Sequence, residues 1–298
     1  MGRELSEHFP IARQTLDEAD QALGFSLSRL CFEGPAEELQ LTANTQPAIL
    51  ACSVAAYRVL VEHGITPSYV AGHSLGEYSA LVAAGSIGFG DALRVVRHRG
   101  EYMQEAVPAG TGAMAALLGI GRERVEELCR AAADGEVVSP ANFNSPDQIV
   151  VSGNTGAVRR VAERAKEAGA KRALLLPVSA PFHCSLMRPA QQRLGPELDA
   201  LPFADLSIPL INNVRAEEVR TGREARQGLM YQIPSPVLWE QSMRRMLSLG
   251  VRKFVEVGPG RVLTGLVRQI DRSVFDSNGA ANVEDLKSLE KTLAALAQ

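Results

Sequence analysis

The sequence is poor in the features that mark several protein classes. Only 5% of its 298 residues are aromatic, and its four cysteines stand at irregular spacing without a Cys-x-x-Cys pair. Four irregularly spaced cysteines are too few for a disulfide framework, and their pattern does not indicate a zinc site. We therefore expect no metal and four buried, free thiols.

Strong net charge and long apolar runs are also lacking. The chain carries 31 basic and 34 acidic residues, a formal charge of −3, which gives no reason to expect nucleic acid as a partner. No run of about 18 apolar residues occurs, and the first residues, MGRELSEHFP, lack the apolar core of a signal peptide. We expect a cytoplasmic protein that does not bind membranes, with 46% hydrophobic residues to form its core.

Apolar periodicity predicts helices and strands through the first hundred residues. Helices are expected over residues 45–63, 75–84 and 89–106, and a short strand over residues 68–71. Helices that flank a short apolar strand favour an α/β layer.

Between residues 112 and 178 the pattern predicts the order β-α-β-β-α-β. The strands are expected at 113–120, 136–144, 148–154 and 171–179, and the helices at 122–133 and 155–170. This is the ferredoxin-like order, so we predict a small subdomain over 112–178, inserted into a larger α/β domain formed by 1–111 and 179–298. In the larger domain we expect strands at 207–214 and 253–258 and helices at 236–249 and 282–297.

The segment GHSLGEYSAL places Ser74 between Gly72 and Gly76, where the expected strand meets the next helix. Flanking glycines permit a sharp turn that exposes the serine hydroxyl, and the helix N-terminus presents free amides to a developing oxyanion. We predict that Ser74 is a nucleophile; the alternative is a turn serine that only caps the helix.

A serine nucleophile needs a base, and the chain has five histidines. His73 adjoins Ser74 and should point the other way, and His8 and His63 occupy helix-like, exposed positions. His183 lies in a Pro-containing loop directly after an apolar strand, where α/β proteins present catalytic groups, so we predict that His183 is the base.

No acidic partner for the histidine is evident. An α/β-hydrolase has its histidine near the end of the chain, after the acid, whereas this chain continues far beyond His183. We therefore expect a Ser–His dyad whose imidazole is held by a neutral group such as a backbone carbonyl.

Arg99 falls on the apolar flank of its helix, between Ala92 and Val95. A guanidinium at a buried position needs an anionic partner, because an unpaired charge there is costly. The candidates are Glu77, Glu105 and the carboxylate of a substrate, which a planar guanidinium binds through two parallel hydrogen bonds.

Several motifs together resemble those of the bacterial malonyl-CoA:acyl carrier protein transacylase family. They are GHSLGEYSAL, EYMQEAVPAGTGAMAALLG, NFNSPDQIVVSGN, KRALLLPVSAPFHCSLM, INNV and EVGPGRVLTGL, and the resemblance runs from about Met1 to Leu266. It implies transfer of malonyl from malonyl-CoA to the phosphopantetheine thiol of acyl carrier protein, for fatty-acid or polyketide synthesis, without a metal or redox cofactor. The fold we predict is a hydrolase-like parallel-sheet domain with the inserted ferredoxin-like subdomain, and a monomer.

The resemblance also implies roles for individual residues. Ser74 would carry the acyl group, His183 would be the base, and Arg99 would grip the malonyl carboxylate. Gln232 would orient the histidine through its main-chain carbonyl, and the amide of Leu75 would be one oxyanion donor.

Phe182, directly before His183, resembles the malonyl-selecting form of the motif, in which a bulky ring crowds the substrate α-carbon. Leu75 agrees with malonyl rather than methylmalonyl as the acyl group. The alternative for Phe182 is an ordinary core aromatic.

Family members begin with an apolar strand that leads into a Gly-Gln-Gly-Ser-Gln loop, whose first glutamine is the second oxyanion contributor. The residues MGRELSEHFP match sequence just after that loop, so we expect both strand and glutamine to be missing from the sequence as given. Either the given start lies downstream of the real one, which we favour, or the protein lacks half of its oxyanion hole. The loss of one such hydrogen-bond donor would lower the catalytic rate about 10²–10³-fold. Two alternatives for the function are a thioester hydrolase acting on acyl carrier protein or CoA, and a non-catalytic carrier-protein docking module.

Overall fold

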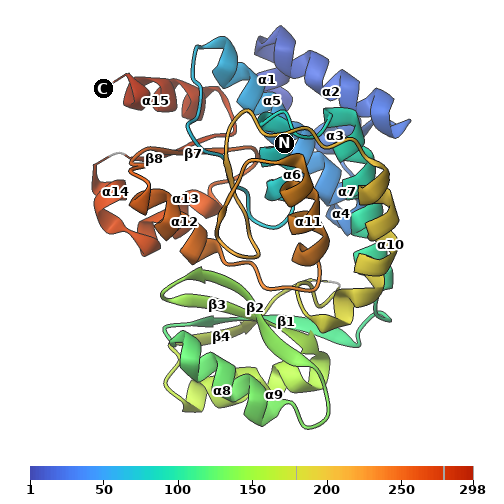
Figure 1. Cartoon of the computed structure of the whole chain (residues 1–298), viewed down its shortest axis with the longest axis vertical. Coiled ribbons are helices and arrows are strands. Elements are labelled where there is room, and N and C mark those ends of the chain that lie inside the picture. Colours follow the sequence, from blue (N-terminus) through green and yellow to red (C-terminus); the bar gives the residue numbers. More distant parts are fainter. Residues whose placement is uncertain (179, 278, 298) are drawn as a thin grey trace.

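A computed structural model describes residues 1–178, 180–277 and 279–297. Figure 1 shows a small sheet with two helices below a larger, mainly helical part. Residues 179 and 298, which bound the predicted second stretch of the larger domain, lie outside the described residues.

The small sheet has the order of elements expected from the sequence. The elements are β1 (Gly112–Leu118), α8 (Arg122–Ala132), β2 (Val138–Ser145), β3 (Gln148–Asn154), α9 (Thr155–Glu167) and β4 (Arg172–Leu175). The strands lie in the order β2-β3-β1-β4, and all pairs are antiparallel.

The two faces of β1 have different partners. Ala115 and Leu117 point toward the apolar sides of α8 and α9, which cover the outer face of the sheet (Figure 1). Met114 and Ala116 point to the other face, where they form a cluster that includes Phe182. This alternation, which the period of two in a strand requires, places the loop before His183 against the sheet.

The larger part contains most of the helices. They are α1 (Arg3–His8), α2 (Pro10–Leu23), α3 (Leu27–Glu33), α4 (Ala36–Gln40), α5 (Thr42–Glu62), α6 (Gly76–Ala83), α7 (Phe89–Glu105), α10 (Arg188–Ala200), α11 (Gly222–Gln232), α12 (Trp239–Ser248), α13 (Val262–Ile270), α14 (Arg272–Asp276) and α15 (Leu286–Leu296), with a short 3-10 helix at Ser185–Met187. Its strands are β5 (Leu210–Ile211), which pairs antiparallel with β6 (Glu218–Val219), and β7 (Phe254–Val257), which pairs parallel with β8 (Ala280–Val283). The molecule is thus a mixed α/β structure with parallel and antiparallel pairing.

Three predicted elements of the larger part differ in the structure. The strand expected at 68–71 is reduced to a single parallel bridge between Val70 and Leu210, and the strand expected at 207–214 to β5. The prediction of a helix over 282–297 was wrong at its start, because residues 280–283 form β8 and pair with β7. A capping box, in which Asp285 and Ser288 exchange side-chain-to-backbone hydrogen bonds, starts α15 only after that strand.

A close crossing of α5 and α7 fixes the inner face of α7. A Cβ atom on Gly100 would lie 2.7 Å from the Cα of Ala43 and 2.7 Å from the carbonyl oxygen of Thr42. Only glycine permits this approach, which brings Arg99 of α7 next to Gln46 of α5.

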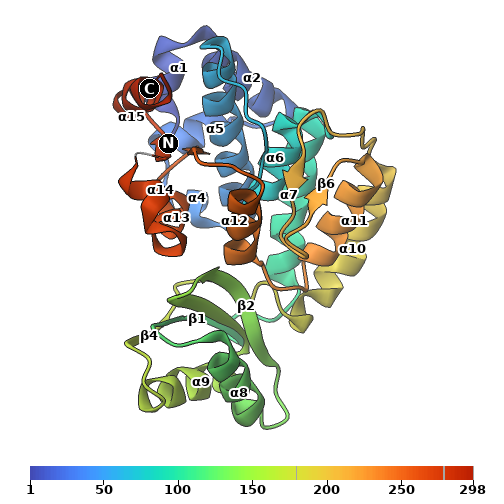
Figure 2. The same ribbon diagram turned by 60° about the vertical axis from the view of Figure 1, so that its left-hand side comes forward.

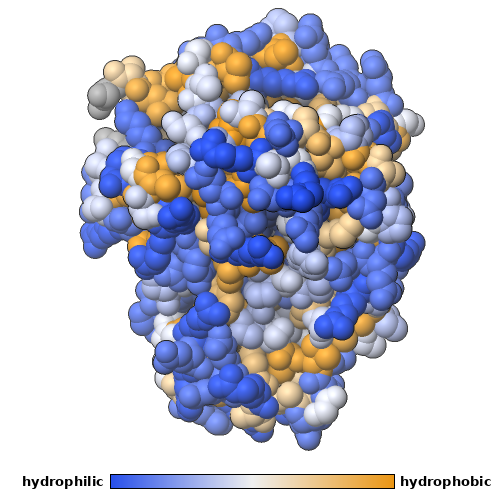
Figure 3. Space-filling view, in the orientation of Figure 1, coloured by the Kyte–Doolittle hydropathy of each residue, from blue (hydrophilic) through white to orange (hydrophobic). Residues whose placement is uncertain are grey.

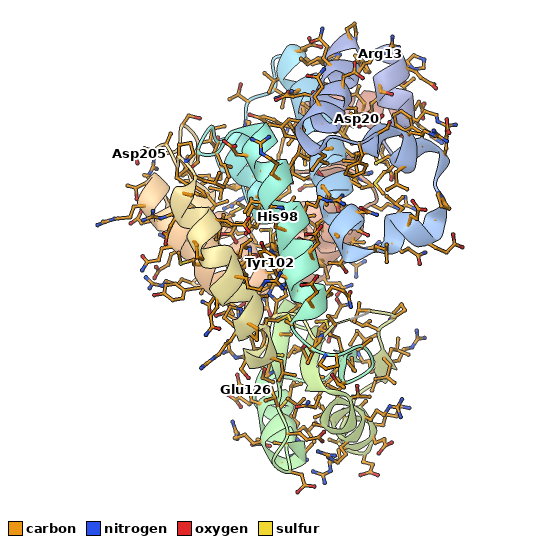
Figure 4. The ribbon with its side chains drawn as sticks, turned by 90° about the vertical axis from the view of Figure 1, so that its right-hand side faces the viewer. Arg13, Asp20, His98, Tyr102, Glu126 and Asp205 are labelled. Atoms are coloured by element: carbon orange, nitrogen blue, oxygen red, sulfur yellow. The ribbon has the colours of Figure 1, made fainter. Side chains whose placement is uncertain are left out.

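The outer side of α7 packs beside α10, as Figure 2 shows. Figure 4 places His98 and Tyr102 on this side of α7. Both hydrogen-bond the carboxylate of Glu197 on α10, the imidazole Nδ1 at 2.7 Å. These contacts tie together the helix that carries Arg99 and the helix that follows His183.

Figure 3 shows hydrophilic side chains over much of one face of the molecule, with hydrophobic side chains between them. Leu174 and Leu175 on β4 are each about half exposed. All four cysteines are buried and free, as predicted. Among the described residues, no helix combines the length and apolar character needed to cross a membrane.

Candidate active site

Ser74 occupies a tight turn directly before α6. A Cβ atom on Gly72 would lie 1.9 Å from the carbonyl carbon of Gly76, so the turn requires glycine at position 72. A Cβ atom on Gly76 would meet nothing within 4 Å, so the expectation that both glycines are needed holds only for the first.

The backbone of Ser74 is left-handed, with a φ of 51°. For a residue other than glycine this conformation costs about 1–2 kcal/mol, and such strain recurs where a side chain must be presented for chemistry. The next N–H group, that of Leu75, makes no hydrogen bond within the described part of the chain. The turn therefore presents a hydroxyl and a free amide together.

His183 lies opposite the serine, and its own φ is also left-handed, at 59°. Its Nε2 lies 2.7 Å from Ser74 Oγ, and its Nδ1 lies 3.1 Å from the main-chain carbonyl oxygen of Gln232. Because a carbonyl oxygen only accepts, we assign the proton to Nδ1, which leaves the Nε2 lone pair for the serine hydroxyl.

The imidazole is neutral around pH 7. Burial, followed by the positive charge of Arg99, lowers the pKa of His183 to about 3, despite the opposing effect of the hydrogen bond that Nδ1 donates to the Gln232 carbonyl. An unprotonated imidazole is the form that can take a proton from Ser74.

Arg99 reaches the same hydroxyl from α7. It is only 2% exposed, and its Nη2 donates to Ser74 Oγ and to Gln232 Oε1, each at 3.0 Å, while its Nη1 donates to Gln46 Oε1 at 2.6 Å. Ser74 Oγ thus accepts from the guanidinium while it donates to His183.

The internal carboxylate partners considered for Arg99 are not used. Glu105 bonds Arg193 instead, and no carboxylate of the described residues lies within 4 Å of the Arg99 guanidinium. Glu77 lies close enough for its charge to act on Arg99 but bonds other groups. The buried guanidinium is therefore held by neutral oxygens, and its charge is available to an anionic ligand.

Gln232, at the end of α11, contacts all three of these residues. Its main-chain oxygen holds His183, its Oε1 holds Arg99, and its Nε2 donates to the carbonyl oxygen of Ser74 at 3.0 Å. The same Nε2 donates to Glu77 Oε2 at 2.8 Å. The side chain is fully buried, so these contacts are not exchanged with water.

Glu77 is a buried carboxyl group below the turn, on the first turn of α6. Burial raises its pKa from 4.5 to about 7, against the lowering effects of Gln232, Asn213 and Arg99. Between these two pH values the folded protein keeps a proton that the unfolded chain has released, so the free energy of unfolding falls as pH rises.

Glu77→Gln should remove this part of the pH dependence. In the wild type we expect the free energy of unfolding to fall by on the order of 3 kcal/mol as pH rises from about 4.5 to above 7. The variant should not show this fall, because its amide stays neutral throughout. Thermal unfolding at a series of pH values measures the difference between the two proteins. Glu105→Gln, at an exposed ion pair, is the control, and a Glu77→Gln profile parallel to the wild type would contradict the assignment.

The other histidines are not at the hydroxyl. His73 is half-buried, and its Nε2 bonds Asn144 Oδ1 of β2 at 2.8 Å, away from Ser74 as expected. His8 and His63 are exposed and bond only main-chain oxygens of their own helices. Phe182, half-buried, joins the apolar cluster under β1.

A cavity of about 710 Å³ opens beside the turn. His73, Leu75 and Asn144 line it near Ser74, and side chains of α5, α12, β7 and α13 line much of its remainder. Among the described residues, no three histidine, cysteine or carboxylate side chains are grouped as a metal site would require.

Three buried polar residues of the site were not predicted as part of it. They are Gln46, Asn144 and Asn213, from three different elements or loops. The only signal in the sequence is an amide side chain inside an otherwise apolar segment, as in TQPAIL and PLINNV.

Comparison with known proteins places these residues in a family. A family model described as an acyl transferase domain matches residues 1–293. The malonyl CoA-acyl carrier protein transacylase of Bacillus subtilis is 50% identical over 273 residues, which cover 91% of this chain and 86% of the relative.

Solved structures agree with this similarity. An acyl carrier protein S-malonyltransferase from Vibrio cholerae superposes with a TM-score of 0.94 at 47% identity, covering 98% of this chain and 94% of that one. A malonyl-transacylase in complex with its type II PKS acyl carrier protein superposes with a TM-score of 0.93 at 46% identity, covering 98% and 93%.

Proposed function

Because the chain belongs to the acyl transferase domain family, we propose that it transfers a malonyl group from malonyl-CoA to the phosphopantetheine thiol of an acyl carrier protein. The relatives named above carry this activity in their names, and one was solved with its carrier protein. The observation that carries the proposal is the buried, carboxylate-free Arg99 beside the Ser74–His183 pair.

The first half of the reaction loads the enzyme. His183 Nε2 takes the proton of Ser74 as Oγ attacks the thioester carbon, and the proton passes to the departing CoA thiolate. The free amide of Leu75 supports the proposal that it donates to the oxyanion. The product is a malonyl ester on Ser74.

The second half repeats these steps in reverse. His183 takes the proton of the carrier-protein thiol, the thiolate attacks the serine ester, and the proton returns to Ser74 Oγ. Because Nδ1 stays bonded to the Gln232 carbonyl, the imidazole keeps its tautomer and orientation through both halves. Neither half takes a metal or a redox cofactor.

Arg99 would select the acyl group. In a malonyl ester, a methylene separates the carbonyl from a free carboxylate, so Arg99, already 3.0 Å from Oγ, lies within reach of that carboxylate. Phe182 would restrict the α-carbon from the side of the small sheet.

The proposal includes the finer features of the fold. We assign residues 1–111 and 179–298 to a hydrolase-like α/β domain and 112–178 to the ferredoxin-like subdomain, in a monomeric, cytoplasmic enzyme. The names of the relatives favour neither a thioester hydrolase nor a non-catalytic docking module.

A loading and transfer experiment tests the function. The full chain is mixed briefly with malonyl-CoA and examined by peptide mass spectrometry, which should find one malonyl group on Ser74. Adding holo acyl carrier protein should move that group to the carrier. No labelled Ser74 peptide would contradict the proposal, and release of free malonate instead of malonyl carrier protein would indicate a hydrolase.

A further inference from the structure

The side chain of Asn213, in the loop after β5, spans the Ser74 turn. Its Nδ2 donates to the carbonyl oxygen of Gly72 and its Oδ1 accepts from the N–H of Ser74, both at 2.7 Å. We propose that Asn213 is a positioning residue, whose amide holds the Ser74 turn so that the hydroxyl meets His183. This inference rests on the proposed function.

Asn213 is itself fixed from two sides. Its backbone N–H donates to Glu77 Oε2 at 3.1 Å, and its Oδ1 accepts a second, longer bond from Gln232 Nε2 at 3.3 Å. It is fully buried, so water does not replace these partners. Since Glu77 lies in the first turn of α6, Asn213 ties the Ser74 turn to the helix that follows it.

The strain at Ser74 makes such a tie necessary. A left-handed serine relaxes toward ordinary backbone angles unless its neighbours hold it, and any rotation of the turn moves Oγ from its 2.7 Å contact with His183. The holding group must donate on one side and accept on the other. A carboxamide does both, whereas an ionised carboxylate only accepts.

Asn213→Ala removes both bonds. We expect the single-turnover rate of malonyl loading on Ser74 to fall about 10–100-fold, with KM for malonyl-CoA within about twofold, because the acyl-CoA contacts stay in place. Asn212→Ala is the matched control. The Asn212 Oδ1 accepts from the backbone N–H groups of Arg215 and Glu217 in the same loop and does not contact Ser74.

Asn213→Asp, which has the same shape, gives a second readout. When ionised, its carboxyl group repels the Gly72 carbonyl. When protonated, it can donate to that carbonyl and accept from the Ser74 N–H as the amide does, so the loading rate of the variant should recover as pH falls. We expect its loading rate relative to wild type to rise about tenfold from pH 8 to pH 5.5. The ionisable groups around it are the same in both proteins, so the ratio reports the changed side chain together with its effect on those groups; they are Glu77, Arg99, His183 and His73.

The outcomes separate this role from the function. Wild type that is not loaded by malonyl-CoA overturns the proposed function. Loaded wild type with Asn213→Ala equal to it, or with Asn212→Ala equally impaired, overturns only the positioning role. Should Asn213→Ala fail to fold, an Asn213→Asp profile that parallels the wild type overturns that role as well.

Discussion

Ser74→Ala should lower malonyl transfer to the carrier protein by about 10⁶-fold. Without Oγ no acyl-enzyme forms, and neither His183 nor Arg99 has a nucleophile to act on. The residual transfer by this variant should proceed without a malonylated enzyme intermediate. Rapid-quench measurement of the malonyl enzyme, followed by the transfer assay, measures both quantities.

Ser79→Ala is the matched control for this result. Ser79 lies in α6 one turn beyond the nucleophile, and its buried hydroxyl has no hydrogen-bond partner within the described part of the chain. Replacing it should leave the rate of transfer within about twofold of wild type. Transfer by Ser74→Ala within tenfold of wild type would exclude the covalent mechanism.

Arg99→Ala should slow the loading of malonyl, which carries a carboxylate, but not the loading of acetyl, which does not. We expect malonyl loading to fall by about 10²–10⁴-fold, since two charge-assisted hydrogen bonds of roughly 1.5–3 kcal/mol each are lost from a buried site. Acetyl loading, which offers no carboxylate, should be unchanged or faster. The ratio of the two loading rates is the measurement, because a partial loss of folded enzyme cancels in it.

Two further variants control for charge and for helix packing. Arg99→Lys keeps the positive charge without the planar fork, so its selectivity should lie between those of wild type and Arg99→Ala. Arg97→Ala, in the same helix, should leave the ratio unchanged, because the Arg97 side chain bonds Asn44 and Glu101 rather than Ser74. Equal losses with malonyl and acetyl donors in Arg99→Ala would show that the residue supports the fold alone.

The sequence predicts those parts of the site whose residues stand out from their immediate neighbours in the chain. Gly72 marks the turn around Ser74, the loop after an apolar strand marks His183, and a charge on an apolar flank marks Arg99. The structure brings the side chains of His183 and Arg99 within hydrogen-bond distance of Ser74 Oγ. Each was visible because it departs from its own surroundings within a few residues.

The supporting residues have no such signature. Asn213 bonds Ser74 across 139 positions of sequence, and Gln46 bonds Arg99 across 53. An amide is uncharged and tolerated in loops and helices alike, so its partner is fixed only by the tertiary fold. For the same reason the pattern cannot assign short strands such as β6 and β8, whose existence depends on a neighbour to pair with.

The backbone carbonyl that holds His183 has a consequence for how this site tolerates genetic change. In an enzyme with a Ser-His-Asp triad, one codon change can delete the group that orients the imidazole. Here the acceptor belongs to the main chain of residue 232, and every amino acid that a codon specifies supplies it. Mutation at this codon alters how Arg99 and Ser74 are held, but it leaves the histidine with its acceptor, so this element of the machinery is buffered against point mutation.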